Sequence, residues 1–404
     1  MPLWKKNLYI MFAAQILSTM GFSMIFPFLP NYVAHLGSSF GFDIVFLAGA
    51  VYSGQAITMA LTSPIWGTLA DRFGKKLMVE RAMFGGSILL LMMAFVPNAE
   101  MLVLVRTIQG AVTGTVGAAN ALVAATAPRE RMGYAMGMLQ VGVWAGVALG
   151  PLIGGVLADA FGYNMAFYFT AALLFIGGII VFIAIEEPND QREKKQGTAG
   201  MVAEWRTVLG APGVSLVFFF RFISWLGRNI LVPYLPLFMA TLILSQDRLN
   251  TLTGLTIALA SAAGTVTAVV LGRLGDQIGH KKILIGCAFA AALFYIPQFF
   301  VTHVWQLLVL QALTGGAAGG IMPVLSALLN HYTKPGHEGA AFGFDNSVTS
   351  LSRAVAPMIG ATIVLFGGYR LIFLCTALLF AATGILAIFK LPDLNPRRLS
   401  SSSD

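Results

Sequence analysis

Long apolar segments alternate with short polar or turn-rich segments along almost the whole chain. About twelve of the apolar segments reach the ~20 residues that a helix needs to cross a ~30 Å hydrocarbon layer. They are rich in Gly, Leu, Ala and Phe and lack the period-two alternation of membrane strands, which favours helices. The segments begin near Leu8, Val45, Leu77, Met101, Tyr134, Met165, Val214, Thr251, Ile283, Trp305, Ala340 and Leu371. The pattern predicts an all-α integral membrane protein with twelve transmembrane helices.

Composition supports a membrane location. Charged residues make up 10% of the chain, against roughly a quarter in soluble domains. Hydrophobic residues reach 57%, and the mean hydropathy is +0.80. So few charges could not cover the surface of a soluble protein of this size. The longest polar stretch, residues 186–213, is also too short for a soluble catalytic domain.

The first apolar segment follows a basic start, MPLWKK, as a secretory signal would. It continues to about Ala34, includes Pro27 and Pro30, and contains no evident small-residue cleavage site. We therefore expect this segment to be retained as the first span.

The basic residues are distributed unequally between the two sides of the predicted membrane. If the N-terminus lies inside, 19 of the 25 Lys and Arg residues fall in inside segments, and only Arg248 and Arg370 fall outside. The positive-inside rule then places both termini in the cytoplasm, and the cell (inner) membrane is the expected location. The net charge of +8 indicates anionic inner-leaflet lipid, rather than nucleic acid, as the partner. The inside residues are Lys5, Lys6, Arg72, Lys75, Lys76, Arg81, Arg129, Arg131, Arg192, Lys194, Lys195, Arg206, Arg273, Lys281, Lys282, Lys334, Lys390, Arg397 and Arg398.

The chain aligns with itself when it is shifted by 205 or 206 residues. FPFLPNYVAHL, from Phe26, lies over VPYLPLFMATL, from Val232, and GPLIGG, from Gly150, lies over APMIGA, from Ala356. Such matches over nearly the full length indicate duplication of a six-span unit, and hence two pseudo-symmetric six-helix bundles. Further matched pairs are Gly21 with Gly227, Pro27 with Pro233, Pro30 with Pro236, Gly74 with Gly279, Gly114 with Gly319, and Gly162 with Gly368.

These patterns divide the chain into four parts. Residues 1–187 form the N-terminal six-helix bundle and residues 213–392 the C-terminal one. Residues 188–212 form a polar cytoplasmic linker, with a short surface helix expected at 201–209, and residues 393–404 form a cytoplasmic tail.

A polar loop between spans two and three is repeated in the second half. GTLADRFGKK, from Gly67 to Lys76, returns as GRLGDQIGHKK, from Gly272 to Lys282. Basic residues suit any cytoplasmic loop, but they do not explain an aspartate in both copies. A carboxylate at the inner end of a span can pair with basic residues or with the N-terminus of a neighbouring helix, which predicts a gating latch. The predicted latch comprises Gly67, Asp71, Arg72, Gly74, Lys75, Lys76 and Asp276.

Within this loop, Gly67 and Gly74 permit close helix approach and a tight turn. The basic residues are expected to anchor it at the inner headgroups. The two copies differ, because Gln277 replaces Arg72 in the second. We therefore expect Asp71 to matter more for gating than Asp276.

The fourth span contains an arginine. In LVLVRTIQGAV, Arg106 lies six residues after Glu100, with Gln109 and Gly110 following it. An arginine in a span costs several kcal/mol unless it reaches water or a partner. The sequence leaves two explanations for Arg106 open: its side chain could snorkel to the outer surface, or it could contact a water-filled cavity. Its counterpart in the second half is Gln311, so the charge belongs to one half only.

The fifth span contains a row of glycines. In GVWAGVALGPLIGG, Gly142, Gly146, Gly150 and Gly154 recur every four residues and leave one helix face smooth. A second helix backbone can approach such a face closely, and Pro151 can kink the helix.

The duplication and these three segments resemble the major facilitator superfamily, most closely its twelve-span bacterial drug:proton antiporters (the multidrug-resistance type). The loop matches the family pattern G-x-L-A/S-D-R-x-G-R/K-R/K, and the fifth span matches GxxxGPxxGG. The resemblance implies alternating access to a midplane site between the halves. It also implies that Arg106 influences proton binding and release. The fifth-span motif that the family associates with antiport comprises Gly146, Gly150, Pro151, Gly154 and Gly155.

The second half has charges of its own inside spans seven and eleven. Arg221 and Arg228 lie seven apart in span seven, and Asp345 and Arg353 lie in span eleven. We expect Asp345 to pair with Arg221, or with Arg353 through a network. Two roles remain open from the sequence. Protonation of Asp345 could couple to transport, or Asp345 and its arginine could form a static ion pair.

Span arginines outnumber span carboxylates four to one. If Arg221 and Arg228 face a cavity unpaired, they favour an anionic or neutral substrate over a cation. A wall of apolar and aromatic residues, including Met24, Phe28, Phe222 and Tyr234, could surround it. The candidate substrate-binding residues are Phe22, Phe26, Arg221, Trp225, Arg228 and Asp345.

The sequence contains no phosphate-binding G-x-x-x-x-G-K-S/T loop, so ATP is not the expected energy source. Cys287 and Cys375 both lie in predicted spans and show no metal-ligand spacing. We therefore expect no catalytic residues, no metal and no cofactor other than protons as coupling ion.

The predicted function is secondary active transport, by proton-coupled efflux of hydrophobic small molecules or drugs. The alternative is a facilitator or proton symporter that imports a sugar, organic acid or other nutrient. One chain already encloses a site, so a monomer suffices.

Overall fold

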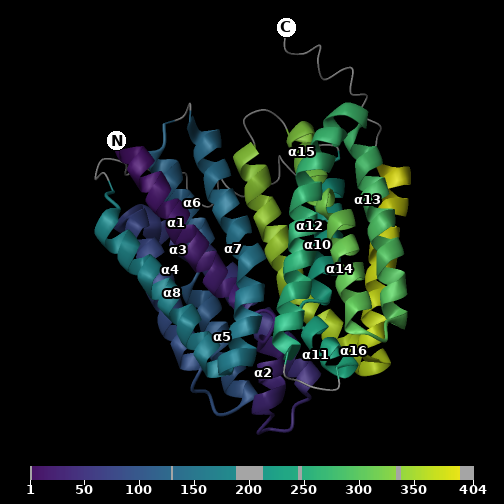
Figure 1. Ribbon diagram of the computed structural model, residues 1–404. Coiled ribbons are helices and arrows are strands. Elements are labelled where there is room, and N and C mark those ends of the chain that lie inside the picture. Colours follow the sequence, from purple (N-terminus) through teal and green to yellow (C-terminus); the bar gives the residue numbers. More distant parts are fainter. Residues whose placement is uncertain (1, 129–130, 188–212, 244–247, 334–337, 392–404) are drawn as a thin grey trace. The chain divides into compact units, whose positions relative to one another are not determined.

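A computed structural model describes residues 2–128, 131–187, 213–243, 248–333 and 338–391, and every regular element in them is helical (Figure 1). The expected linker, its helix at 201–209 and the tail at 393–404 lie outside these residues. The helices of the first part of the chain are α1 (Leu3–Met24), α2 (Leu29–Leu36), α3 (Ile44–Phe73), α4 (Lys75–Met93), α5 (Ala99–Val112), α6 (Thr115–Thr126), α7 (Met132–Phe161) and α8 (Tyr163–Ala184). Those that follow are α10 (Val214–Ile230), α11 (Leu235–Leu242), α12 (Leu249–Ile278), α13 (His280–Tyr295), η3 (Ile296–Phe300), α14 (Val304–Gly319), α15 (Ile321–Tyr332) and α16 (Glu338–Lys390).

Among the described residues, these helices form twelve membrane-spanning segments. Nine single or continued helices are long and apolar enough to cross a bilayer, and the bent pair α1 and α2 makes a tenth. Helix α4, which begins with charged residues, is another. Straight, the 53 residues of α16 would extend about 80 Å, far more than one crossing needs. Non-helical backbone at Gly368 divides α16 into two spans, which confirms the predicted number.

Helix breaks recur at matched positions of the two halves. The first span bends by 42° between α1 and α2, and α10 and α11 are separated at the equivalent Leu231–Tyr234. Gly74 and Gly279 have φ of 104° and 102°, and Gly162 and Gly368 have φ of 84° and 73°. These left-handed values suit glycine and turn the chain between spans. The duplication read from sequence is therefore also a duplication of backbone conformation.

The chain forms two compact units. Of the described residues, the first unit contains those up to 187 and those within Pro233–Ala258, and the second contains 213–232 and those from 259 to 391. Pro233–Ala258, which the sequence assigns to the second half, thus packs with the first unit. In the first unit α1 packs on α7 and α8, and α3 on α5. In the second unit α10 and α13 both pack on α16.

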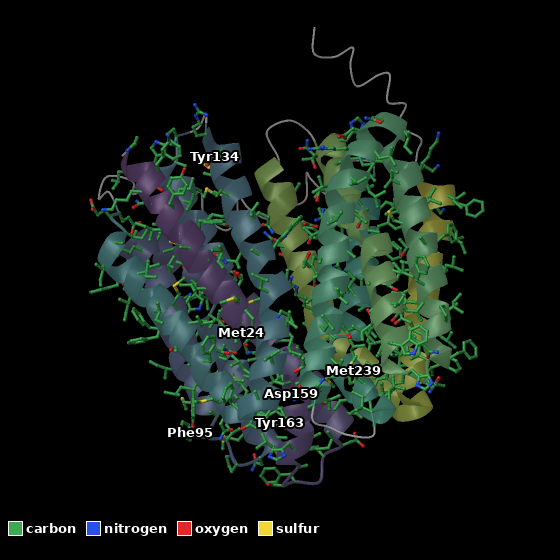
Figure 2. All side chains as sticks on the ribbon, in the orientation of Figure 1. Met24, Phe95, Tyr134, Asp159, Tyr163 and Met239 are labelled. Atoms are coloured by element: carbon green, nitrogen blue, oxygen red, sulfur yellow. The ribbon has the colours of Figure 1, made fainter. Side chains whose placement is uncertain are left out.

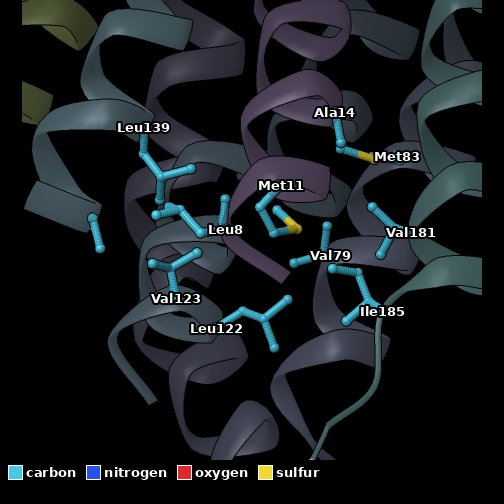
Figure 3. Packing of buried hydrophobic residues seen from close by; sticks show 12 residues of the cluster. Leu8, Met11, Ala14, Val79, Met83, Leu122, Val123, Leu139, Val181 and Ile185 are labelled. Atoms are coloured by element: carbon cyan, nitrogen blue, oxygen red, sulfur yellow. The ribbon is translucent and has the colours of Figure 1, made fainter. Parts of the chain in front are cut away.

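Apolar side chains fill the interior of the first unit and also cover the outside of the protein. One cluster joins Leu8 and Met11 of α1 to Val79 of α4 and Leu122 of α6 (Figure 3). Outside such clusters large apolar side chains remain exposed, as for Phe366 at 88%. Exposed apolar surface on this scale is what contact with lipid requires.

Candidate functional site

The first polar loop joins α3 to α4 and is held by the end of α8. Gly74 provides the tight turn that the sequence predicted. The backbone N–H groups of Lys75 and Lys76 donate to the two carboxylate oxygens of Glu187, each at 2.9 Å. This carboxylate caps the free N–H groups at the start of α4 and faces its partly positive end. The side chain of Asp71 lies outside the described residues.

Two predictions about this loop need correction. Lys76 was expected to reach the lipid headgroups, but its Nζ donates to the Phe182 carbonyl at 2.7 Å and lies 3.7 Å from Glu80. Its side chain therefore ties α4 to α8. A Cβ added at Gly67 would meet no atom of the described chain within 4 Å, so the close approach expected there is not present.

Glu186, next to the capping carboxylate, ties the end of α8 to the start of α1. Lys6 Nζ donates to Glu186 Oε1 at 2.6 Å, and Asn7 Nδ2 donates to the Glu186 carbonyl at 2.8 Å. The hydrogen bond and the charge of Lys6 lower the pKa of the Glu186 carboxyl. The acidic pair after the sixth span was visible in the sequence, but its partners were not.

The second copy of the loop is more open. Asp276 is 73% exposed at its side chain, and its Oδ1 lies 3.5 Å from His280 Nε2. An exposed contact of this length contributes little. The second aspartate of the predicted latch is therefore weakly held.

Arg106 is enclosed in the first unit. Its side chain is 1% exposed, and Nη1 donates to Gln109 Oε1 at 2.5 Å. Glu100 lies at the start of α5, which is its predicted outer end, and Gln109 lies one turn deeper than Arg106. Because Arg106 bonds to this deeper residue, its side chain does not snorkel outward. Tyr52 of α3 is close enough to interact electrostatically with Arg106. Sequence reasoning missed Tyr52, since nothing in its local sequence links it to α5.

The glycine row of α7 lies against the backbone of α1. A Cβ at Gly146 would clash with Thr19 and Met20, and one at Gly154 would clash with the carbonyl of Met24. Ser23 Oγ of α1 donates to the Gly146 carbonyl at 2.8 Å. The smooth face predicted from the four-residue spacing thus brings two helix backbones into contact.

The other side of the same motif packs on the start of α12. A Cβ at Gly155 would clash with the Asn250 carbonyl, and one at Gly254 would clash with the Pro151 carbonyl. Both residue pairs lie within the first unit. The Gly-Pro-x-x-Gly-Gly segment therefore contacts a second helix as well as α1.

A carboxylate completes this contact. Asp159 lies near the end of α7 (Figure 2). It accepts from Asn250 N at 3.2 Å, Asn250 Nδ2 at 2.8 Å and Thr251 N at 2.7 Å. Asn31 Nδ2 of α2 donates to Asn250 Oδ1 at 2.9 Å. Asp159 thereby caps α12, as Glu187 caps α4. The sequence hypothesis missed Asp159, although it lies only four residues after Gly155.

Asp345 and Arg221 form an ion pair in the second unit. Arg221 Nε lies 2.5 Å from Asp345 Oδ1, and both side chains are less than a tenth exposed. Arg221 Nη1 also donates to Ser326 Oγ of α15 at 3.1 Å. Of the two partners considered from sequence, Arg221 holds Asp345. Arg353 does not.

The other two span arginines lie beside Trp225. The Arg228 Cζ is 5.7 Å from the Trp225 ring centroid, and the Arg353 Cζ is 4.9 Å from it. Both arginine side chains are exposed. The four span arginines therefore do not form one buried set, because Arg106 and Arg221 are buried and these two are not.

The residues of the predicted aromatic wall differ in burial. Phe22 and Phe26 are partly exposed. Met24, Phe28 and Tyr234 are completely buried. Phe28 meets Phe167 edge to face at 5.3 Å, so it belongs to the core. Apolar residues of lining and core cannot be told apart by type alone.

Duplicated helix breaks, the glycine row against α1 and the repeated loop together describe a transporter-like architecture. The sequence matches the model of the Major Facilitator Superfamily over residues 11–246 and 217–404. The chain belongs to this superfamily. It is accordingly a multi-pass membrane protein of a transporter superfamily whose members move small molecules.

Curated relatives within the superfamily are similar over the full length. Multidrug resistance protein MdtG of Dickeya zeae is 33% identical over 404 residues, which cover 99% of this chain and 98% of that protein. MdtG of Salmonella paratyphi A is 34% identical over 401 residues, covering 98% and 97%.

Solved structures of superfamily transporters share the fold. The nucleoside transporter NupG has a TM-score of 0.75 at 16% identity and covers 94% of this chain and 98% of its own. A bacterial homolog of the human lysosomal transporter Spinster, inward-facing and unoccupied, has a TM-score of 0.77 at 14% identity, covering 96% and 97%. At these identities the likeness establishes the fold alone.

Proposed function

We propose that this protein exports hydrophobic small molecules or drugs in exchange for protons, by alternating access. The observation that carries the proposal is the Arg221–Asp345 ion pair. Asp345 is the one carboxylate that is buried among the described residues, and it lies inside a membrane span. A carboxylate buried in a span costs free energy, so such residues are rare and mark proton or substrate pathways. The charge of the carboxylate changes when it binds a proton. The multidrug resistance name of the relatives supports the substrate class and the direction.

The pair provides a means of coupling. When Asp345 is ionised, it neutralises Arg221 and holds α16 to α10. When Asp345 takes up a proton, Arg221 loses its counter-charge and keeps the hydrogen bond to Ser326. The balance between two packings of these helices then depends on the proton, which is the requirement for proton-coupled transport. Arg106, buried and bonded to Gln109, supplies a fixed positive charge in the other half.

We place the protein in the cell (inner) membrane, with both termini in the cytoplasm. The distribution of basic residues supports this orientation. A single chain contains both repeats, so a monomer suffices for transport.

The test is transport in inside-out membrane vesicles with an acidic lumen. We expect lipophilic dyes to accumulate in the lumen of wild-type vesicles while protons leave it, and accumulation to be lost when the gradient is collapsed. Asp345→Asn should abolish the response to the gradient. Asp43→Asn, which changes the cap of α3 outside the spans, is the matched control and should leave it intact.

Two outcomes would contradict the proposal. If Asp345→Asn kept full gradient-driven accumulation, Asp345 would not be the coupling residue. If substrate and protons crossed in the same direction, the protein would be a symporter, the alternative that the sequence left open.

A further inference from the structure

Three hydrogen-bond donors converge on the exposed side of α10 and α16. Trp225 and Arg228 lie three residues apart on α10 and so share a helix face. Arg353 comes from α16, and both guanidinium groups lie within 6 Å of the Trp225 ring centroid. Residues distant in sequence thus place two positive charges beside one indole.

This cluster contains donors and no acceptor. In the part of the chain that the structure describes, neither Arg228 nor Arg353 takes part in an ion pair. Asp345, the buried carboxylate of α16, is held by Arg221. The Tyr295 hydroxyl of α13 is close enough to interact electrostatically with Arg228, but it carries no formal charge to balance the guanidinium. The Trp225 Nε1 is buried and has no hydrogen-bond partner among the described residues. Guanidinium and indole groups donate and cannot accept, so an acceptor from outside this set is required.

The position of the cluster excludes contact with lipid as its explanation. Arg228 lies fourteen residues after Val214, or about 21 Å along α10, well inside the span Val214–Leu242. An exposed arginine at this depth is costly in hydrocarbon and is found where water enters. Cation–π contact with Trp225 offsets only part of this cost. The two arginines therefore face an aqueous pathway and not the acyl chains.

We propose that Arg228, Arg353 and Trp225 form a subsite for the anionic group of an amphipathic substrate, such as a carboxylate or a sulfonate. The proposal rests on the export function proposed above and specifies its substrate class. Arginine presents a planar fork of donors that matches two oxygens of such a group, and two arginines can hold it from two helices. The indole N–H supplies a further donor. A cationic substrate would be repelled at this position.

The test is ligand binding to the purified full-length protein in detergent, without a gradient. Three probes share one ring system and differ in charge: naphthalene-1-sulfonate, the neutral naphthalene-1-sulfonamide and the cationic 1-naphthylmethylammonium. We expect the sulfonate to bind more tightly than the sulfonamide by about ten-fold or more, the size of one charge-assisted hydrogen bond. The ammonium should bind most weakly. Equilibrium dialysis measures all three.

Variants locate the effect. Arg228→Gln and Arg353→Gln should each remove the preference for the sulfonate and leave sulfonamide binding unchanged. Arg353→Lys keeps the charge without the fork and should retain part of the preference, so it remains informative if a glutamine variant fails to fold. Arg370→Gln is the matched control, since Arg370 donates to the Phe299 carbonyl away from the cluster. It should bind like wild type.

Anionic lipid headgroups carry the same chemistry and are tested separately. Dioleoylphosphatidylglycerol added to the micelles should compete only weakly with the sulfonate. If the lipid bound and the sulfonate did not, the substrate subsite would be refuted. Equal binding of sulfonate and sulfonamide, or an unchanged preference in both glutamine variants, would also refute it. Anion preference without gradient-driven export would overturn the proposed function alone, and export without anion preference would overturn the subsite alone.

Discussion

At the scale of single residues, the buried charges of this protein differ in how they are compensated. Asp345 and Arg221 neutralise each other, whereas Arg106 has one hydrogen bond, to the amide oxygen of Gln109, and among the described residues its buried Nε has no hydrogen-bond partner. Removing one member of a buried ion pair leaves the other charge without compensation, which costs more than losing the pair. The Arg221–Asp345 pair should therefore show strong coupling between substitutions.

We predict that Arg221→Gln lowers the free energy of unfolding by about 3–5 kcal/mol, because it leaves the Asp345 carboxylate buried and unpaired. Arg221→Gln combined with Asp345→Asn should recover much of this loss. Unfolding of the detergent-purified proteins at neutral pH, compared in a double-mutant cycle, measures the coupling. Additive effects of the two substitutions would show that the pair does not stabilise the fold.

At the scale of helices, contacts between backbones and caps from distant residues fix where elements begin and pack. The glycine row lets α7 lie against α1, and Asp159 and Glu187 cap α12 and α4. Each cap satisfies N–H groups that the helix itself leaves free. The effects of changing these residues should be local to one helix contact or one helix start.

Replacing a glycine by alanine within α7 should have opposite effects at two positions. Gly154→Ala adds a Cβ against the Met24 carbonyl and should destabilise the protein by about 1–3 kcal/mol. Gly137→Ala on the same helix meets no described atom within 4 Å and should be neutral or stabilise by up to about 1 kcal/mol. Thermal unfolding in detergent compares the two. A similar loss in both would mean that backbone contact is not the reason for the glycine row.

Asp159→Asn should loosen the start of α12. The amide has one acceptor oxygen where the carboxylate uses two, and it lacks the charge that favours a helix N-terminus. We expect a local loss of about 0.5–2 kcal/mol, seen as faster amide hydrogen exchange at Asn250 and Thr251. Asp43→Asn, which alters the cap of α3, should leave these two amides unchanged. Unchanged exchange in Asp159→Asn would show that the cap is not needed.

At the scale of the whole molecule, the two repeats share a backbone plan and differ in charge. The counterpart of Arg106 is Gln311, whose Nε2 donates to Gln298 Oε1 at 2.9 Å. With the 206-residue shift, Arg221 of the second half corresponds to Gln15, and Arg228 corresponds to Phe22. Duplication thus preserved the turns and breaks, while the chemistry was distributed unevenly.

The same asymmetry applies to the repeated loop. We predict that Asp71→Asn reduces proton-driven efflux by at least about ten-fold, whereas Asp276→Asn changes it less than about two-fold, since the exposed Asp276 is weakly held. Efflux from vesicles carrying each variant, at matched protein content, provides the comparison. Equal losses would indicate that both copies act as latches.

Much of the fold could be predicted from the sequence, because apolar runs indicate the spans, glycines indicate the turns and self-alignment indicates the repeat. Gly74 and Gly279 marked their turns, and the glycine row marked a helix contact. The partners of Asp159 and Glu187 could not be predicted, because each contact joins residues about a hundred positions apart. Apolar residues cover both the lipid-facing and the internal surfaces, so burial of Phe28 or exposure of Arg353 leaves no periodic signal.

The carboxylate of Asp159 also determines how its junction with α12 can open. Separating the two helices would leave the Asn250 and Thr251 donors and the carboxylate itself without partners, and only water could replace them. Opening at this end is therefore a hydration step. An excluded osmolyte such as sucrose lowers the water activity and should therefore slow the separation of the two helices. Osmotic pressure thus becomes a variable that acts on the transport cycle.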